Sequence, residues 1–140
     1  MKKDVLLTIA STQRMLGEEP ETTRLVTDGF LEETEGAILL SYAESALTGL
    51  EGTTTCFRIE PERIILRRTG ALSSEMHFSL ETEHRSLYDM GFGALMLTVR
   101  TEHIRSDLTA AGGTLEVGYA ITIEEQTTGW VDYRITVRPK

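Results

Sequence analysis

Two charged side chains occupy positions where the spacing of apolar residues predicts a buried face. Arg68 follows Ile64 and Leu66 at intervals of two residues. Glu44 follows Tyr42 in the same way. Side chains on a β-strand alternate between its two faces, so both charges are expected to point inward with their apolar neighbours. A guanidinium in such a place binds carboxylate or phosphate groups, and a carboxyl beside an apolar wall can move a proton near neutral pH.

Three interpretations of this pair stay open at the level of sequence. In the first, Glu44 and Arg68 bridge each other or lie at a solvated barrel end, and their role is structural. In the second, Arg68 binds the anionic group of a small ligand in a cavity lined by tyrosines. In the third, the same residues carry out catalysis. The predicted ligand-binding residues are Tyr42, Glu44, Arg68, Tyr88 and Tyr119, and no catalytic residue is assigned.

The other reactive side chains form no pattern typical of a metal site or a nucleophile. His77, His84 and His103 are not paired at a ligand spacing, and Cys56 is the single cysteine. His77 also stands between apolar neighbours on a predicted strand, so it is expected to point outward. No Gly-x-Ser-x-Gly motif is present. We therefore expect no metal and no cofactor.

The charge balance disfavours two classes of partner. The chain has 14 Lys and Arg against 22 Asp and Glu, a formal net charge of -8. Nucleic acids and anionic membranes are bound mainly through Lys and Arg, so neither partner is expected. Arg58, Arg63 and Arg67 lie close together in the sequence, and we expect them on the outer face, paired with acidic side chains.

Three features suggest where the protein works and in what state. One cysteine cannot form an intramolecular disulfide, which fits a reducing compartment. The apolar run 5–10 is broken by Thr8, so we interpret it as a strand rather than a signal peptide. The protein is therefore expected to be cytoplasmic. Trp130 is predicted to face outward, where it is a candidate dimer contact, and a monomer or a homodimer is expected.

Alternation of apolar and polar residues recurs along nearly the whole chain and predicts about nine strands. Their approximate ranges are 5–13, 22–33, 37–44, 53–60, 63–69, 75–80, 94–103, 115–123 and 131–137. The segment 81–93 is expected to be a loop between two strands. Its part 86–93 is expected to be a crossover whose Tyr88 and Phe92 plug the barrel end, with a lid over the mouth as the alternative. Short helical turns are expected at 87–92 and 104–111, and a turn at 124–129.

These strands predict a single all-β domain over residues 1–140. A single open sheet would leave one apolar face in water, so the strands must close into a barrel or stack as two sheets. We favour an antiparallel, calycin-like (lipocalin-like) β-barrel of about 8–10 strands, with a sandwich as the alternative. The interior of such a barrel is filled by side chains or holds one small ligand.

Several segments resemble the YwiB-like family of uncharacterised bacterial proteins. They are 41–53 (Ser-Tyr-Ala-Glu-Ser-Ala-Leu-Thr-Gly-Leu-Glu-Gly-Thr), Arg68-Thr69-Gly70, Met76-His77-Phe78 and Ser86-Leu87-Tyr88. The resemblance runs over nearly the full chain and implies a calycin-like barrel. It implies no established activity.

These observations lead to one main functional hypothesis and two alternatives. The main one is a barrel that binds a small amphipathic or anionic molecule in, or at the mouth of, its interior. A lumen enzyme of decarboxylase or cyclase type, using Tyr, Arg and Glu, is the first alternative. The second is an acidic adaptor protein whose interior is packed and without function.

Overall fold

The computed structural model describes residues 2–46, 50–80, 82–89, 94–123 and 126–140, with the backbone alone for 86–89 and 94–95. It contains ten strands: β1 (Lys2–Met15), β2 (Glu21–Thr34), β3 (Ala37–Ala43), β4 (Thr53–Ile59), β5 (Ile64–Gly70), β6 (Ser73–Phe78), β7 (His84–Asp89), β8 (Ala94–Ser106), β9 (Gly113–Ile123) and β10 (Gln126–Pro139). No helix in the described part of the chain has the length and apolar character needed to cross a membrane.

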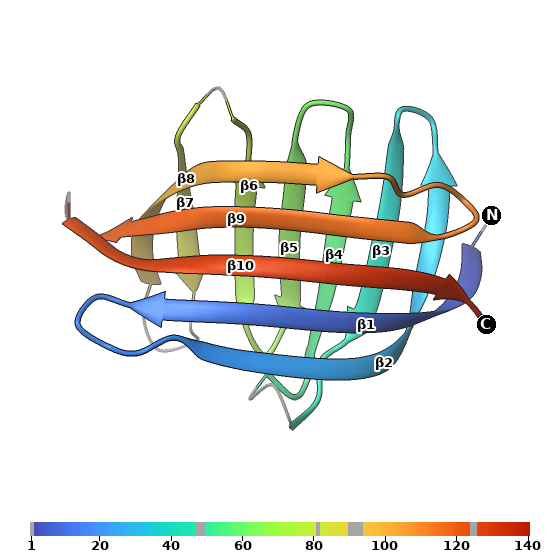
Figure 1. Ribbon diagram of the computed structural model, residues 1–140, viewed down its shortest axis with the longest axis horizontal. Helices are drawn as coiled ribbons and strands as arrows, with labels where there is room; N and C mark the ends of the chain where they lie inside the picture. Colours follow the sequence, from blue (N-terminus) through green and yellow to red (C-terminus); the bar gives the residue numbers. More distant parts are fainter. Residues whose placement is uncertain (1, 47–49, 81, 90–93, 124–125) are drawn as a thin grey trace.

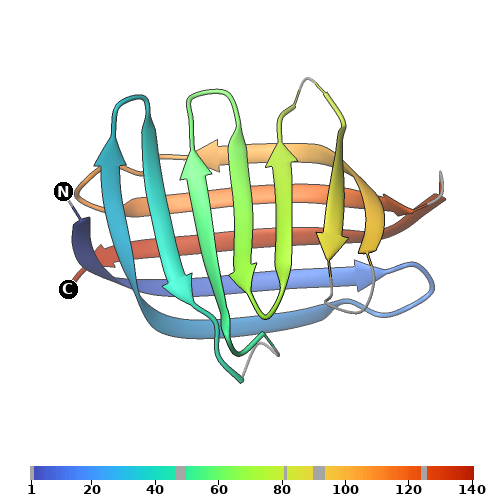
Figure 2. The ribbon, with the colours of Figure 1, turned by 180° about the vertical axis from the view of Figure 1, so that it is seen from behind.

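The strands form a closed antiparallel barrel in which each strand pairs with its neighbours in sequence and β10 returns to β1. The register sets Val5 opposite Pro139, so the two ends of the chain lie side by side. In Figure 1, the long strands β1, β8, β9 and β10 run across the front, and β3 to β6 cross behind them at a steep angle. The view from behind in Figure 2 shows β2 curving from one layer into the other. The predicted all-β barrel is confirmed.

The core consists of the inward-facing side chains of the described strands other than β7, whose described side chains are not buried. Its largest fully buried apolar side chains are Phe57, Phe78, Leu7, Leu40, Ile64, Leu66, Leu115, Ile135, Val99 and Val117. These residues fall at the alternating positions that the sequence pattern predicts. Burial of large apolar side chains contributes about 1.5–3 kcal/mol each, so this face supplies much of the stability of the barrel.

The predicted loop over 81–93 is wrong for part of its length, because β7 occupies His84–Asp89. This strand has no regular apolar alternation. It pairs with β8 along its whole length but with β6 only at Ser73 and Ser74. Its β-structure therefore comes from the long neighbouring β8, which local pattern does not reveal. The rest of the predicted plug, including Phe92, lies outside the described residues.

Two other local predictions need correction. The helical turn expected over 104–111 is absent, because β8 continues to Ser106 and a Thr109–Gly112 bridge closes the following turn. The turn expected over 124–129 is shorter, because β10 already begins at Gln126 and carries a bulge between Thr127 and Gly129. In both cases tertiary pairing extends a strand beyond its alternating core.

Gly29 lies where β2 parts from β3. β2 pairs with β1 from Glu21 to Glu32, but with β3 only from Phe30 onward. Among the described strand pairs, residues 21–29 have no partner on the β3 side. A Cβ atom on Gly29 would lie 2.7 Å from Leu7 Cδ1 and 2.7 Å from the Ser41 carbonyl oxygen. Only glycine permits this close approach of β2 to the core at the point of divergence.

Replacing Gly29 by valine should lower the free energy of unfolding by about 2–3 kcal/mol, because the new side chain overlaps Leu7 and the Ser41 backbone. Urea denaturation followed by circular dichroism measures the change. The neighbouring Asp28→Ala is the control, since Asp28 is exposed and pairs only with Lys140 on the surface. Equal unfolding midpoints for Gly29→Val and the wild type would show that β2 does not need the glycine.

Candidate functional site

A cavity of about 530 Å³ occupies the interior of the barrel. Among its lining residues, Ile9, Met76 and Leu97 are buried and form apolar wall. It reaches the surface at Gln13 and Glu21, which are exposed. β2 contributes lining residues from its stretch without β3 pairing, so the divergence at Gly29 borders the cavity. The volume is in the range of cavities that bind small molecules.

Arg68 is placed in the cavity wall by the alternation of β5. Ile64 and Leu66 are fully buried, and Arg68 follows them with 7% of its surface exposed. Its Nη2 donates a hydrogen bond of 3.1 Å to the Tyr133 hydroxyl, whereas its buried Nε has no partner among the described side chains. Burial works against the charged form, but the oxygens of Tyr133 and Tyr119 hold the pKa of Arg68 above its ordinary value. The structure thus places a charged and incompletely bonded guanidinium beside the cavity.

Glu44 lies at the same end of the barrel and is also buried, with 8% of its surface exposed. Its Oε2 accepts a hydrogen bond of 2.5 Å from the Thr55 hydroxyl. Arg68 and Glu44 both line the cavity, yet they form no ion pair, which would require an N–O distance of 4.0 Å or less. Sequence reasoning correctly places both residues inside. The interpretation in which the two bridge each other is wrong.

Thr55 and Ser74 complete a polar row across the inner wall. In the strand register, Tyr42 lies opposite Thr55, Thr55 opposite Arg68, and Arg68 opposite Ser74. Thr55 is fully buried, and the buried hydroxyl of Ser74 has no hydrogen-bond partner among the described residues. The sequence prediction omits Thr55, Ser74 and the Arg68 partner Tyr133. They could have been found in the sequence, because they occupy the same alternating positions as the inward-facing apolar residues of their strands.

Tyrosines surround the guanidinium. Tyr42 and Tyr119 are buried, and both line the cavity, as the sequence predicts. The Tyr119 ring lies 4.6 Å from that of Phe78 and 6.4 Å from that of Tyr133. Tyr88 pairs through its backbone with Ser74, but its side chain lies outside the described residues. Its place in the site stays a prediction.

A comparison with family models decides to which group of proteins this barrel belongs. Residues 7–135 match the family described as Domain of unknown function (DUF1934). The chain belongs to this family. The match covers the strands that carry every cavity residue discussed above. The family description gives no activity. The function must therefore be argued from the residues of the cavity.

A relative of this DUF1934 chain, and the crystal structure of the same protein, support the fold. The chain is 26% identical over 106 residues to the uncharacterized beta-barrel protein YwiB of Bacillus subtilis (strain 168), covering 76% of this chain and 73% of YwiB. It also resembles the crystal structure of YwiB from Bacillus subtilis with a TM-score of 0.82 at 21% identity, over 96% of this chain and 92% of the other. The structural likeness shows the fold. The resemblance predicted from the sequence is confirmed.

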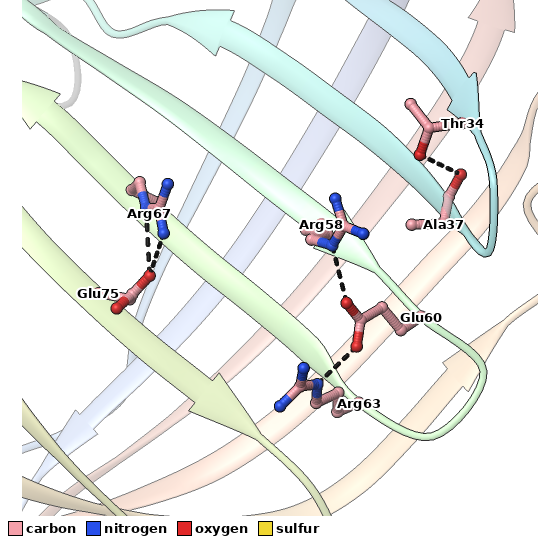
Figure 3. Close-up of polar contacts among 7 residues, drawn as sticks. All are labelled: Thr34, Ala37, Arg58, Glu60, Arg63, Arg67 and Glu75. Atoms are coloured by element: carbon pink, nitrogen blue, oxygen red, sulfur yellow. Dashed lines mark hydrogen bonds and ion pairs between the residues drawn. The ribbon is translucent and has the colours of Figure 1, made fainter.

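Arg58, Arg63 and Arg67 of the DUF1934 barrel lie outside the cavity, as predicted. Figure 3 shows Glu60 between Arg58 and Arg63, and Arg67 beside Glu75. The N–O distances are 2.7 Å for Arg58–Glu60 and 2.5 Å for Arg67–Glu75. Arg67 and Arg68 are neighbours on β5 with opposite surroundings. Arg67 is exposed and paired, and Arg68 is buried and lacks a carboxylate partner within ion-pair distance among the described residues.

His77 and His84 lie close together in the structure, although their spacing in the sequence does not indicate it. The His77 and His84 rings stack with their centroids 4.6 Å apart, and His77 points away from the core as predicted. Within the described residues, no three His, Cys, Asp or Glu side chains are grouped so that they could hold a metal ion. Trp130 is half-buried under the guanidinium of Arg14, 4.3 Å from its ring centroid, and its role as a dimer contact stays a prediction.

The burial of Tyr42 beside Glu44 can be tested through the stability of the protein at alkaline pH. Burial, and next the Glu44 carboxylate, raise the pKa of Tyr42 well above its ordinary value of 10.0. Above pH 10 the unfolded chain releases this proton and the folded chain keeps it, so the free energy of unfolding falls as the pH rises. The wild type should lose up to about 1.4 kcal/mol per pH unit more than Tyr42→Phe.

Urea titrations of both proteins at increasing pH measure this difference. The other tyrosines are common to the two proteins, so the effect of their titration cancels. Below pH 9 the difference in free energy of unfolding between the two proteins should stay constant to within about 0.3 kcal/mol. Parallel loss of stability in both proteins above pH 10 would show that Tyr42 titrates normally and is not buried beside Glu44.

Proposed function

We propose that the barrel binds a small amphipathic molecule through an anionic group. The observation that carries the proposal is the Arg68 guanidinium, which is buried in the cavity wall and whose Nε has no partner among the residues that the structure describes. Removing an ion from water costs several kcal/mol even after relaxation of the surroundings, and buried charges are normally paired. A carboxylate or phosphate of a bound ligand provides that pairing, with charge-assisted and bidentate hydrogen bonds.

The rest of the cavity suits the apolar part of such a ligand. Ile9, Met76, Leu97 and Val131 are buried side chains that line it. Hydrophobic walls with a few well-placed polar groups are the usual composition of small-molecule sites. The polar row at one wall therefore orients the head group, and the apolar side chains cover the body.

The alternatives are separated by different observations. An adaptor with a packed interior does not agree with a cavity of about 530 Å³. A lumen enzyme would use the same residues as a binding protein and would differ from it by turnover that is lost in Glu44→Gln. No pair of cavity residues in the described part of the chain favours a particular reaction, so binding is the function that the site supports best.

Octanoate and octan-1-ol test the proposal as a matched pair of probes that differ in the anionic group. Isothermal titration calorimetry should show octanoate binding to the wild type and little binding of the alcohol. Arg68→Met should weaken octanoate binding at least about tenfold, because the charge-assisted hydrogen bonds are lost. Arg67→Met on the outer face of the same strand is the matched control and should bind like the wild type.

Unchanged octanoate affinity in Arg68→Met would contradict the proposal. Urea denaturation of each variant verifies that the fold is retained. If Arg68→Met does not fold, Arg68→Lys replaces it, since lysine keeps the charge but loses the planar fork that binds a carboxylate bidentately. Octanoate should then bind more weakly than to the wild type, and equal binding would count against the guanidinium contact.

A further inference from the structure

We infer that the ligand is an amphipathic zwitterion, with a cationic amine beside its anionic group, as in an amino acid with an apolar side chain. The inference rests on the proposed function and deepens it. The anion meets Arg68, and the amine meets Glu44. Both residues line the cavity and each is more than nine-tenths buried.

The wall holds the two opposite charges apart. Thr55 lies opposite Arg68 in the register of β4 and β5, and its hydroxyl donates to the Glu44 carboxylate. The Arg68 guanidinium instead donates to Tyr133, from the other layer of the barrel. Each charge is thus held by a neutral hydroxyl rather than by the other charge. Two buried, opposite and unpaired charges on one cavity wall are complementary to a head group that carries both signs.

The charges of the cavity argue against a simple anion as the natural ligand. The charged lining residues are Glu21, Glu44 and Arg68, so two carboxylates accompany one cation. Glu21 is exposed and screened by water, whereas Glu44 is buried. A second negative charge beside Arg68 would therefore be repelled by Glu44 across a medium of low dielectric constant. An amine on the ligand offsets this repulsion and adds a charged donor alongside the hydroxyl of Thr55, which already donates to Glu44.

The geometry of the row also limits the head group. Tyr42 lies opposite Thr55 on the adjacent strand, and Ser74 lies on the far side of Arg68. The Ser74 hydroxyl and the Arg68 Nε are both buried, and neither has a hydrogen-bond partner within the described part of the chain. Among the residues of the row, Arg68 lines the cavity and offers donors to an anion, and Glu44 offers an acceptor on the Tyr42 side. The amine is accordingly expected on the Tyr42 side of Arg68, and the anion at the guanidinium itself.

The test compares octanoate, 2-aminooctanoate and N-acetyl-2-aminooctanoate by calorimetry on the wild type, Glu44→Gln and Arg68→Met. The wild type should bind 2-aminooctanoate about tenfold more tightly than the other two probes. Glu44→Gln should reverse this preference, with weaker binding of 2-aminooctanoate and tighter binding of octanoate. Glu75→Gln on the outer face is the matched control and should leave the preference unchanged.

The outcomes separate this inference from the function on which it rests. Octanoate binding that depends on Arg68, without preference for the amino form, overturns the zwitterion and leaves the anion site standing. Equal weakening of all probes in Glu44→Gln also overturns it, because Glu44 would then be structural. Absence of binding by every probe contradicts the proposed function as well. If Glu44→Gln does not fold, octanoate and the acetylated probe decide together on the wild type. Both lack the cationic amine, and only the acetylated probe is bulkier, so 2-aminooctanoate must bind more tightly than either.

Discussion

The interior of this barrel must keep a guanidinium charged within a wall of largely apolar side chains. Arg68 meets that constraint with hydroxyl groups, through a hydrogen bond to Tyr133 and the nearby oxygens of Tyr119 and Tyr42. Hydroxyls stabilise a charge without neutralising it. The positive charge of Arg68 can therefore still attract an external anion, whereas an ion pair within the wall would neutralise it. Glu44 is treated in the same way by Thr55.

The cavity exists because the barrel does not close evenly. β2 pairs fully with β1 but joins β3 only after Gly29, and its first residues border the cavity instead of a neighbouring strand. Ten strands crossing in two layers also enclose more space than the inward side chains fill. The fold thus supplies the volume, and the polar row on β3 to β6 supplies its chemistry.

Charge is divided sharply between the two faces of the wall. Arg67 and Arg68 are adjacent in sequence, but Arg67 is paired with Glu75 in solvent. Arg68 faces the cavity, and no carboxylate in the described ranges pairs with it. Surface pairs such as Arg67–Glu75 contribute little to stability, whereas an unpaired buried charge is costly and is typically kept for function. This contrast makes Arg67 the natural reference for every experiment on Arg68.

The alternation of residues was enough to determine the all-β class, most strand positions and the inward direction of Glu44, Arg68, Tyr42 and Tyr119, because a strand has only two faces. It could not reveal β7, whose strand character comes from β8, nor the partners of the buried charges. Those depend on strand register and barrel curvature, which bring Thr55 to Glu44 and Tyr133 to Arg68. Parity along a strand decides which side a residue faces, and only the closed barrel decides what it meets there.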